Sequence, residues 1–357
     1  MRNRTSNLRI PCSDALPLNH RDSTFVEVRL MVMTWLWLAV FLTITWNTAQ
    51  ADKQKNIVFQ ANYEDLITGC WEGSFVLNEC EERCECRNGE LVNCYRVRKD
   101  FIKMDIHERR RFLDAYKIVS MYPSFRKDYK RVVAYHITYT PTELLHEGPW
   151  IFLPWHRWWL VEFENLLRRV DCRVTMPYWN WSRVANHWWR GIGKEDFWSP
   201  EAHGLGGDGK TPSLCVVNGP FREDKWSLLT IGGGGCLKRN FSYVHLTGDE
   251  EHVRDTLALP LEEFLQFEYI LREVYHNEIH WYVGGTMYTT EAANAPEVVP
   301  HHSFLDKIWR KWQKKGEQYK NVFFYDVPWK FPNSNYHGWQ WLDSDNLPDQ
   351  VKVTYED

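Results

Sequence analysis

The sequence lacks an excess of charge of either sign. Its 43 Lys and Arg residues are nearly balanced by 47 Asp and Glu residues, which leaves a formal net charge of −4 at pH 7. Nothing in this balance suits a nucleic-acid partner or an anionic membrane surface. The sequence also has no internal repeat of fixed period, so a repeat architecture is not expected.

Long apolar runs are scarce, and the sequence contains one, at residues 31–46. Arg29 precedes this run, and Ala49-Gln50-Ala51 follows it as a small-x-small cleavage pattern. The run is short for a membrane span of about 20 residues but suits a signal-peptide core. We predict that residues 1–51 are an N-terminal extension with a signal peptide, with Met31 or Met33 as alternative starts. The alternative is an uncleaved signal anchor. The mature chain is expected to be secreted and to carry no stable membrane span.

The cysteines have a spacing that lacks two Cys-x-x-Cys pairs, which disfavours the alternative of a zinc site. Cys12 lies in the N-terminal extension. An even number remains, which predicts disulfides in an oxidising compartment. Five of them fall within a 25-residue stretch, in a predicted Cys-rich module at residues 52–96, so one must pair outside it. Proximity favours Cys172 as that partner and leaves Cys215 to pair with Cys236. The eight are Cys70, Cys80, Cys84, Cys86, Cys94, Cys172, Cys215 and Cys236.

Residues 97–357 form the predicted main domain, which is mainly α-helical. Apolar residues at helical spacing predict helices over 98–117, 128–139, 260–282 and 301–313, and a further helix that begins near Pro154. Residues 173–245 are rich in Gly, Pro and Trp and are expected to form long loops. Residues 351–355 are a possible strand.

Histidines recur at metal-binding spacing in two parts of this domain. His276 and His280 are four residues apart, so a helix places both imidazoles on one face. His301 and His302 follow about 20 residues later, and a second set, His136, His146 and His156, lies upstream. Two such sets point to two metal ions that face each other.

Four motifs in order give the sequence a family resemblance. Residues 152–157 read Phe-Leu-Pro-Trp-His-Arg, and residues 177–181 read Pro-Tyr-Trp-Asn-Trp. His276-Asn-x-x-His280 precedes Val283-Gly-Gly, and His301-His302 precedes Phe304 and Asp306. Over residues 95–355 the chain resembles tyrosinases and related type 3 copper proteins, a group that includes catechol oxidases and molluscan haemocyanin units. The resemblance implies a four-helix bundle that holds a dicopper centre, with long loops and little β structure.

The resemblance also implies the ligands of two copper ions. The first ion takes His136, His146 and His156, and the second takes His276, His280 and His302. Neutral imidazole suits copper. The interval of ten residues between His146 and His156 is one longer than the family usually has. The other histidines of the domain are expected to be second-shell or surface residues: His187, His203, His245, His252, His301 and His337.

Two further positions bear on substrate chemistry by the same resemblance. Asn277 and a nearby glutamate, Glu273 or alternatively Glu268, orient a water that deprotonates a monophenol in the family. Val298 stands where the family has a Phe beneath the phenol ring. Pro300 can begin a helix but is expected to keep Val299 extended. No cysteine lies near His146, so a thioether crosslink to that ligand is not expected.

These features predict a secreted dicopper oxidoreductase of tyrosinase or catechol oxidase type. Its expected partners are O2 and either small phenols or protein tyrosines. The alternative is a copper-binding relative without turnover that has a structural or matrix role, and a third possibility is non-redox chemistry with zinc. Oxygen carriage fits less well, because carriers are usually large multi-unit arrays. Asn180 and Asn240 begin glycosylation sequons, and Asn240 is favoured because tryptophans flank Asn180.

Overall fold

The computed structural model describes residues 70–139, 146, 151–190, 196–229, 234–322, 330–332 and 334–357. The predicted signal segment at residues 1–51 lies outside the described residues. Cys70–Asp357 form one compact unit. None of the helices within the described ranges has the length and apolar character needed to cross a membrane. The predicted boundary between residues 96 and 97 stays a prediction.

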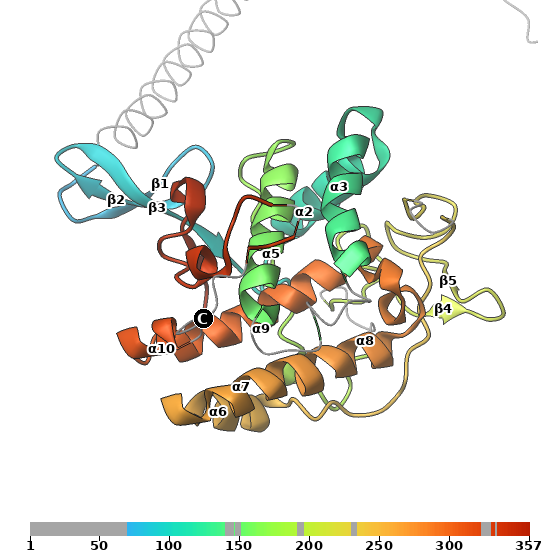
Figure 1. Ribbon diagram of the computed structural model, residues 1–357. Helices are drawn as coiled ribbons and strands as arrows, with labels where there is room; N and C mark the ends of the chain where they lie inside the picture. The colour runs from blue at the N-terminus through green and yellow to red at the C-terminus, as the bar shows by residue number, and fades with distance from the viewer. Residues whose placement is uncertain are drawn as a thin grey trace, which may run out of the picture. The chain divides into compact units, whose positions relative to one another are not determined.

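A small sheet opens the described chain (Figure 1). Strands β1 (Phe75–Leu77), β2 (Arg83–Arg87) and β3 (Glu90–Arg98) are antiparallel neighbours, and β6 (Val353–Tyr355) adds to β3 in parallel. Asn88 and Gly89 connect β2 to β3, and both have positive φ values, 51° and 77°. A two-residue turn of this kind matches the twist of paired strands, which explains why Asn-Gly stands here. Strand β6 confirms the C-terminal end of the possible strand predicted at residues 351–355.

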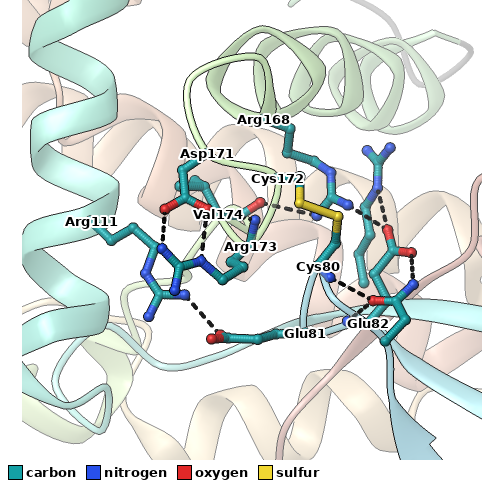
Figure 2. The surroundings of a disulfide bond; sticks show 11 residues. Cys80, Glu81, Glu82, Arg111, Arg168, Asp171, Cys172, Arg173 and Val174 are labelled. Atoms are coloured by element: carbon teal, nitrogen blue, oxygen red, sulfur yellow. Dashed lines mark hydrogen bonds and ion pairs between the residues drawn. A yellow bond between two sulfur atoms is a disulfide. The ribbon is translucent and has the colours of Figure 1, made fainter. Parts of the chain in front are cut away.

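The eight cysteines form four disulfides, so the predicted disulfide framework is confirmed and the alternative of a zinc site is not. Cys70–Cys86 and Cys84–Cys94 lie within the small sheet region, and Cys215–Cys236 joins two loop segments. Cys80–Cys172 ties the small sheet to the chain after α5 (Phe152–Arg168), as parity and proximity predicted. Figure 2 shows this bond beside two ion pairs, Arg111–Glu81 at 2.8 Å and Arg168–Glu82 at 2.6 Å.

The first long helix begins later than the sequence pattern predicts. Arg98 ends β3, and α2 spans Ile106–Met121. Asp105 accepts hydrogen bonds from the backbone N–H groups of His107 and Glu108, and the Glu108 side chain bonds back to the Asp105 N–H. This capping box fixes the helix start, so the prediction of helix over residues 98–105 was wrong.

Two of the helices predicted to carry histidines start earlier than expected. Helix α3 spans Pro123–Tyr139, and α9 spans Val298–Gln313. Pro300 occupies the first turn of α9, where a proline leaves no intrahelical hydrogen bond unmade. Val299 is therefore helical, and the expectation that Pro300 keeps it extended was wrong.

The helix predicted over residues 260–282 is divided into segments of different type. It comprises a 3-10 turn η2 (Leu261–Glu263), α7 (Phe264–Tyr269), a π-helical segment η3 (Ile270–His276) and α8 (Asn277–Val283). A π segment changes the direction in which side chains project, and such segments are frequent at functional sites. Periodicity alone did not reveal it.

The remaining elements are short. The helices are α6 (Glu250–Ala258) and α10 (Glu317–Asn321), and the strands are β4 (Gly209–Lys210) and β5 (Cys215–Val216). Single turns complete the set: η1 (Trp181–Val184), η4 (Gly285–Tyr288), η5 (Thr290–Asn294), η6 (Gly338–Trp341) and η7 (Pro348–Gln350). The described residues between 173 and 245 are thus mostly loops, as predicted, and the mainly helical fold class is confirmed.

Buried ion pairs join α5 to its surroundings. Glu164 is fully buried and accepts hydrogen bonds from Arg98 of β3 at 3.2 Å and from the Met176 backbone N–H at 2.6 Å. Arg157, at the other end of α5, bonds to Asp306 of α9 at 2.6 Å and lies 3.7 Å from the centre of the Trp309 ring. The Glu164 contacts fix α5 against β3, and the Arg157 contacts fix it against α9; α5 and α9 carry His156 and His302.

Candidate metal centre

Seven histidines from five parts of the fold converge in the interior. His136 comes from α3 and His156 from α5, while His276 and His280 come from the η3–α8 segment. Each of the seven is buried except His146, which is half-buried. The last two of the seven, His301 and His302, are neighbours in α9.

The three histidines predicted for the first metal lie together. The ring centres of His136 and His146 are 5.4 Å apart, those of His136 and His156 5.6 Å, and those of His146 and His156 5.4 Å. Helices α3 and α5 supply two of these rings, and His146 belongs to the connection between them. The three rings therefore converge although His146 lies outside both helices.

The histidines predicted for the second metal form an adjoining group. The His276 and His280 ring centres are 4.4 Å apart, and the His302 ring centre lies 5.0 Å from that of His276 and 5.8 Å from that of His280. The two groups meet where the His302 ring stacks on the His156 ring at 4.2 Å. The four imidazoles of His276, His280, His301 and His302 present nitrogens within 4.8 Å of one another, as do those of His136, His156 and His302.

Local hydrogen bonds orient three of these rings. The Nδ1 atom of His156 is 2.7 Å from the Phe152 carbonyl oxygen, and Nδ1 of His280 is 2.7 Å from the Met287 carbonyl oxygen. Nδ1 of His276 is 2.9 Å from Oδ1 of Asn277. The Nε2 atoms of the same three rings are buried and have no hydrogen-bond partner among the described residues. A metal-binding imidazole has this arrangement, with one nitrogen held by the protein and the other turned to the ion.

Burial keeps these imidazoles neutral. It lowers the pKa of His136, His156, His276, His301 and His302 well below the ordinary value of histidine, and the neighbouring imidazoles lower it further. Burial also lowers the pKa of His280, to about 4. A neutral ring keeps a lone pair for a metal at neutral pH, so no proton must leave before a metal binds. The group fits a copper pair, for which neutral nitrogen ligands are suitable.

A buried arginine connects the two groups. Arg272 of η3 donates to Glu268 at 2.8 Å and to the His146 carbonyl oxygen at 2.7 Å, and it also pairs with Glu273. Glu273 in turn accepts a hydrogen bond from Nδ2 of Asn277 at 2.8 Å. The structure thus brings Glu273 beside Asn277, whereas the alternative, Glu268, is fully buried against Arg272.

Sequence reasoning did not single out Arg272, and it set His301 aside as a second-shell or surface residue. Glu268 stands four residues before Arg272, a spacing that signals an ion pair on a helix, but no local pattern signals the contact with His146. His301 is fully buried, and its ring centre lies 5.7 Å from that of His276. It belongs to the cluster in space, although its neighbour His302 makes the contact with the first group.

Helices α3, α5, α8 and α9 around paired histidine clusters define a helical protein built for two metal ions (Figure 1). Residues 126–315 match the family described as the common central domain of tyrosinase. The chain belongs to the tyrosinase family of type 3 copper proteins, and the predicted cofactor, a pair of copper ions, is confirmed at the level of that family.

Curated relatives agree with this membership. The chain is 29% identical to the tyrosinase of Streptomyces lincolnensis over 236 residues, which cover 61% of this chain and 83% of that protein. It is 30% identical to the tyrosinase of Streptomyces glaucescens over 242 residues, with the same coverage. At this level of identity the relatives support a copper oxidase of the tyrosinase type.

A solved structure shares the fold. The polyphenol oxidase of Thermothelomyces thermophila superposes with a TM-score of 0.57 at 18% identity, covering 74% of this chain and 89% of that one. This likeness supports the helical core predicted from the sequence.

Proposed function

We propose that this protein oxidises phenols and catechols to quinones with O2. The observation that carries the proposal is the pair of adjoining histidine groups, in which His156, His276 and His280 are each held at Nδ1 and turn Nε2 to the interior. Tyrosinases and a polyphenol oxidase among the similar proteins support the same chemistry by their names.

The proposed ligands divide into two sets of three. His136, His146 and His156 hold the first copper ion, and His276, His280 and His302 hold the second. When bound, the copper pair supplies the redox chemistry between the phenol and O2. Of the two neighbours in α9, we assign His302 and not His301 as the ligand, because the His302 ring also stacks on His156 of the first group.

Asn277 and Glu273 handle the proton of the substrate in this proposal. Nδ2 of Asn277 donates to one carboxylate oxygen of Glu273, and Arg272 pairs with the other. The Glu273 side chain is 32% exposed, so it can exchange protons with water, and Asn277 links it to His276. A carboxylate this close to a metal-held ring can accept the hydroxyl proton of a phenol directly or through one water. Glu268 is less suited, because Arg272 covers it in the interior.

The electron balance sets what an assay should find. Oxidation of one monophenol to an ortho-quinone consumes one O2 and releases one water. Oxidation of two catechols to two quinones consumes one O2 and releases two waters. Small phenols and tyrosine side chains of other proteins both satisfy this chemistry, and we propose both as substrate classes.

Secretion is part of the proposal. Four disulfides suit an oxidising compartment. Of the two sequon asparagines, Asn240 is exposed, whereas Asn180 is 9% exposed and accepts a hydrogen bond from Ser182. We therefore propose Asn240 as the glycosylated residue. Peptide mapping of protein secreted from eukaryotic cells, with and without removal of N-glycans, tests this assignment.

The test of the proposed function is turnover by purified protein loaded with copper. We expect two copper ions per chain, and quinone formation with O2 uptake from both a monophenol, such as N-acetyltyrosine ethyl ester, and a catechol. Zinc-loaded protein serves as the control and should be inactive. Two bound copper ions without oxidation of either substrate would overturn the proposal and favour the copper-binding relative without turnover.

A further inference from the structure

A cleft separate from the histidine groups lies between α6 and α9. Its volume is about 750 Å³, and turn η1 closes one side of it. Phe304, Lys307, Ile308 and Lys311 line it from α9. These residues follow one another at helical i, i+3, i+4 and i+7 spacing, so they form one stripe of the helix, whereas His302, two residues before Phe304, projects to the opposite side.

The floor of this α6–α9 cleft is apolar. Val253 and Leu257 of α6 face Phe304 and Ile308 of α9 across it. Phe304 packs edge-on against Trp181 of η1, with ring centres 4.8 Å apart. Phe304 is 4% and Ile308 2% exposed, so the apolar surface open to a ligand belongs mainly to Leu257, Ala258 and the aliphatic stems of the lining Lys and Arg side chains.

The rim of the cleft is positively charged, although the whole chain carries a net charge of −4. Five cations line the cleft against two acidic residues, Glu250 and Asp357. The cations are Arg183, Arg254, Lys307, Lys311 and Lys315.

Three of the cations already have close partners. Arg183 pairs with Asp100 at 3.3 Å, and Lys307 donates to the Tyr178 hydroxyl at 2.7 Å. Lys315 donates to backbone carbonyl oxygens at the C-terminal end of α6.

The other two cations are available to a ligand. Arg254 is 70% exposed, and its nearest carboxylate, that of Glu251, is 3.9 Å away. Lys311 is exposed and has neither a hydrogen bond nor an ion pair within the part of the chain that the structure describes.

We propose that the α6–α9 cleft binds a small organic anion with an apolar body, such as an alkyl or aryl sulfate or carboxylate. The anionic group lies between Arg254 and Lys311, and the apolar body covers Leu257, Ala258 and the aliphatic stems of the lining cations. An uncharged phenol leaves the two cations unpartnered, so this ligand class differs from the substrates of the metal centre. The two rim cations come from different helices, and a bound anion therefore links α6 to α9.

The test uses copper-free protein, so its outcome does not depend on the proposed oxidase activity. Isothermal titration calorimetry with octyl sulfate, below its micelle concentration, should show saturable binding of one molecule per chain. Octyl glucoside is the uncharged probe of matched chain length and should bind at least about tenfold more weakly, a difference of about 1.4 kcal/mol. The double variant Arg254→Glu/Lys311→Glu should weaken octyl sulfate binding by a similar factor.

A matched charge reversal controls for long-range electrostatics. Lys127 and Lys130 of α3 are exposed and lie outside the cleft, and Lys127→Glu/Lys130→Glu makes the same change in net charge. This control should bind octyl sulfate as the unmodified protein does, and thermal melting should show that both double variants fold. The proposal is overturned if octyl sulfate binding is not saturable, if octyl glucoside binds equally well, or if the two double variants bind octyl sulfate alike.

Discussion

The two histidine groups of the metal centre are held by different means. The second group comes from one stretch of chain, η3, α8 and α9, and nearby atoms hold two of its rings, Oδ1 of Asn277 for His276 and the Met287 carbonyl oxygen for His280. The first group takes His136 and His156 from two helices and His146 from the connection between them. His146 is tied from the opposite group, where Arg272 donates to its carbonyl oxygen at 2.7 Å.

This difference implies an asymmetry in how the two sites depend on each other. Atoms of their own segment hold His276 and His280, so the positions of these two ligands do not depend on the first group. The first site depends on a residue of the second group for the position of one ligand. Substitutions in the segment of the second group should therefore weaken copper binding at the first site more than substitutions in the first group weaken binding at the second.

The largest effect is expected from loss of a second-site ligand. His280→Ala removes one of three proposed ligands and should abolish phenol oxidation and reduce the copper content from two ions to one per chain. Metal analysis after exhaustive dialysis, together with a quinone assay, measures both. His252→Ala is the control, because the His252 side chain is 58% exposed and lies on α6. Oxidation by His280→Ala at the unmodified rate would show that the ligand assignment is wrong.

Substitution of Arg272, which donates to the His146 carbonyl oxygen, should have the next largest effect. Arg272→Met keeps most of the side-chain volume but removes the donor to His146, so the first copper ion should bind about 10- to 100-fold more weakly, as is typical when an outer partner of a ligand is lost. The second ion should be affected less. Competitive titration with a copper chelator resolves the two affinities, and equal weakening at both sites would remove the proposed asymmetry.

Arg272→Lys provides a comparison for the same position. Lysine keeps the charge but has no planar group that can serve Glu268 and His146 at once. Its first-site affinity should lie between those of Arg272→Met and the unmodified protein. A value equal to that of Arg272→Met would mean that geometry, and not charge, positions His146.

A smaller effect is expected from the carboxylate beside Asn277. Glu273→Gln keeps the shape but removes the base, so monophenol oxidation should fall about 10²-fold or more while catechol oxidation and copper content change little. Glu268→Gln is the matched comparison, and it tests the alternative base. A loss of monophenol oxidation in Glu268→Gln alone would transfer the role to Glu268.

The smallest effect on copper binding and oxidation is expected from the fold around α5, where a substitution acts on stability instead. Burial alone would raise the pKa of Glu164, but the Arg98 and Arg96 guanidiniums outweigh it and hold the pKa at about 2, below the ordinary value of 4.5. A carboxyl with a lowered folded-state pKa stabilises the fold above its unfolded value, and that contribution is lost as the pH falls through the folded value. Glu164 should therefore contribute fully at pH 5 to 8 and progressively less from about pH 4.5 to pH 2.

Acid unfolding of Glu164→Gln checks this pH window. The variant removes the nearer carboxylate of the buried Arg98 guanidinium and leaves Asp306, at 3.5 Å, as its acidic partner, so it should lose about 3 kcal/mol of stability at neutral pH. Its unfolding free energy should then depend less on pH below 4.5 than that of the unmodified protein. Parallel curves for the two proteins would contradict the assignment.

More of the second histidine group than of the first could be predicted from the sequence. His276 and His280 at i, i+4 spacing need only a helix to converge, and both motifs around them are local. His146 lies in a connection without periodicity, so its approach to His136 and His156 depends on tertiary contacts. Arg272 was missed for the same reason, since its partner is 126 residues away in the chain.

The errors in the fold have similar causes. Periodicity predicted one helix over residues 260–282, but a π segment has nearly the same apolar pattern as an α-helix and was not recognised at Ile270–His276. The early helix start at residue 98 was wrong because Arg98 pairs with Glu164 and belongs to a strand that β6 completes from the far end of the chain. The Asp105–Glu108 capping box was the local signal that places this start correctly.

The central claim is that two triads of histidines hold one copper ion each, and crystals of copper-loaded protein test it most directly. Anomalous scattering at the copper absorption edge should show two peaks, one among His136, His146 and His156 and the other among His276, His280 and His302. A single peak, or a second copper ion bound by His301 in place of His302, would contradict the account.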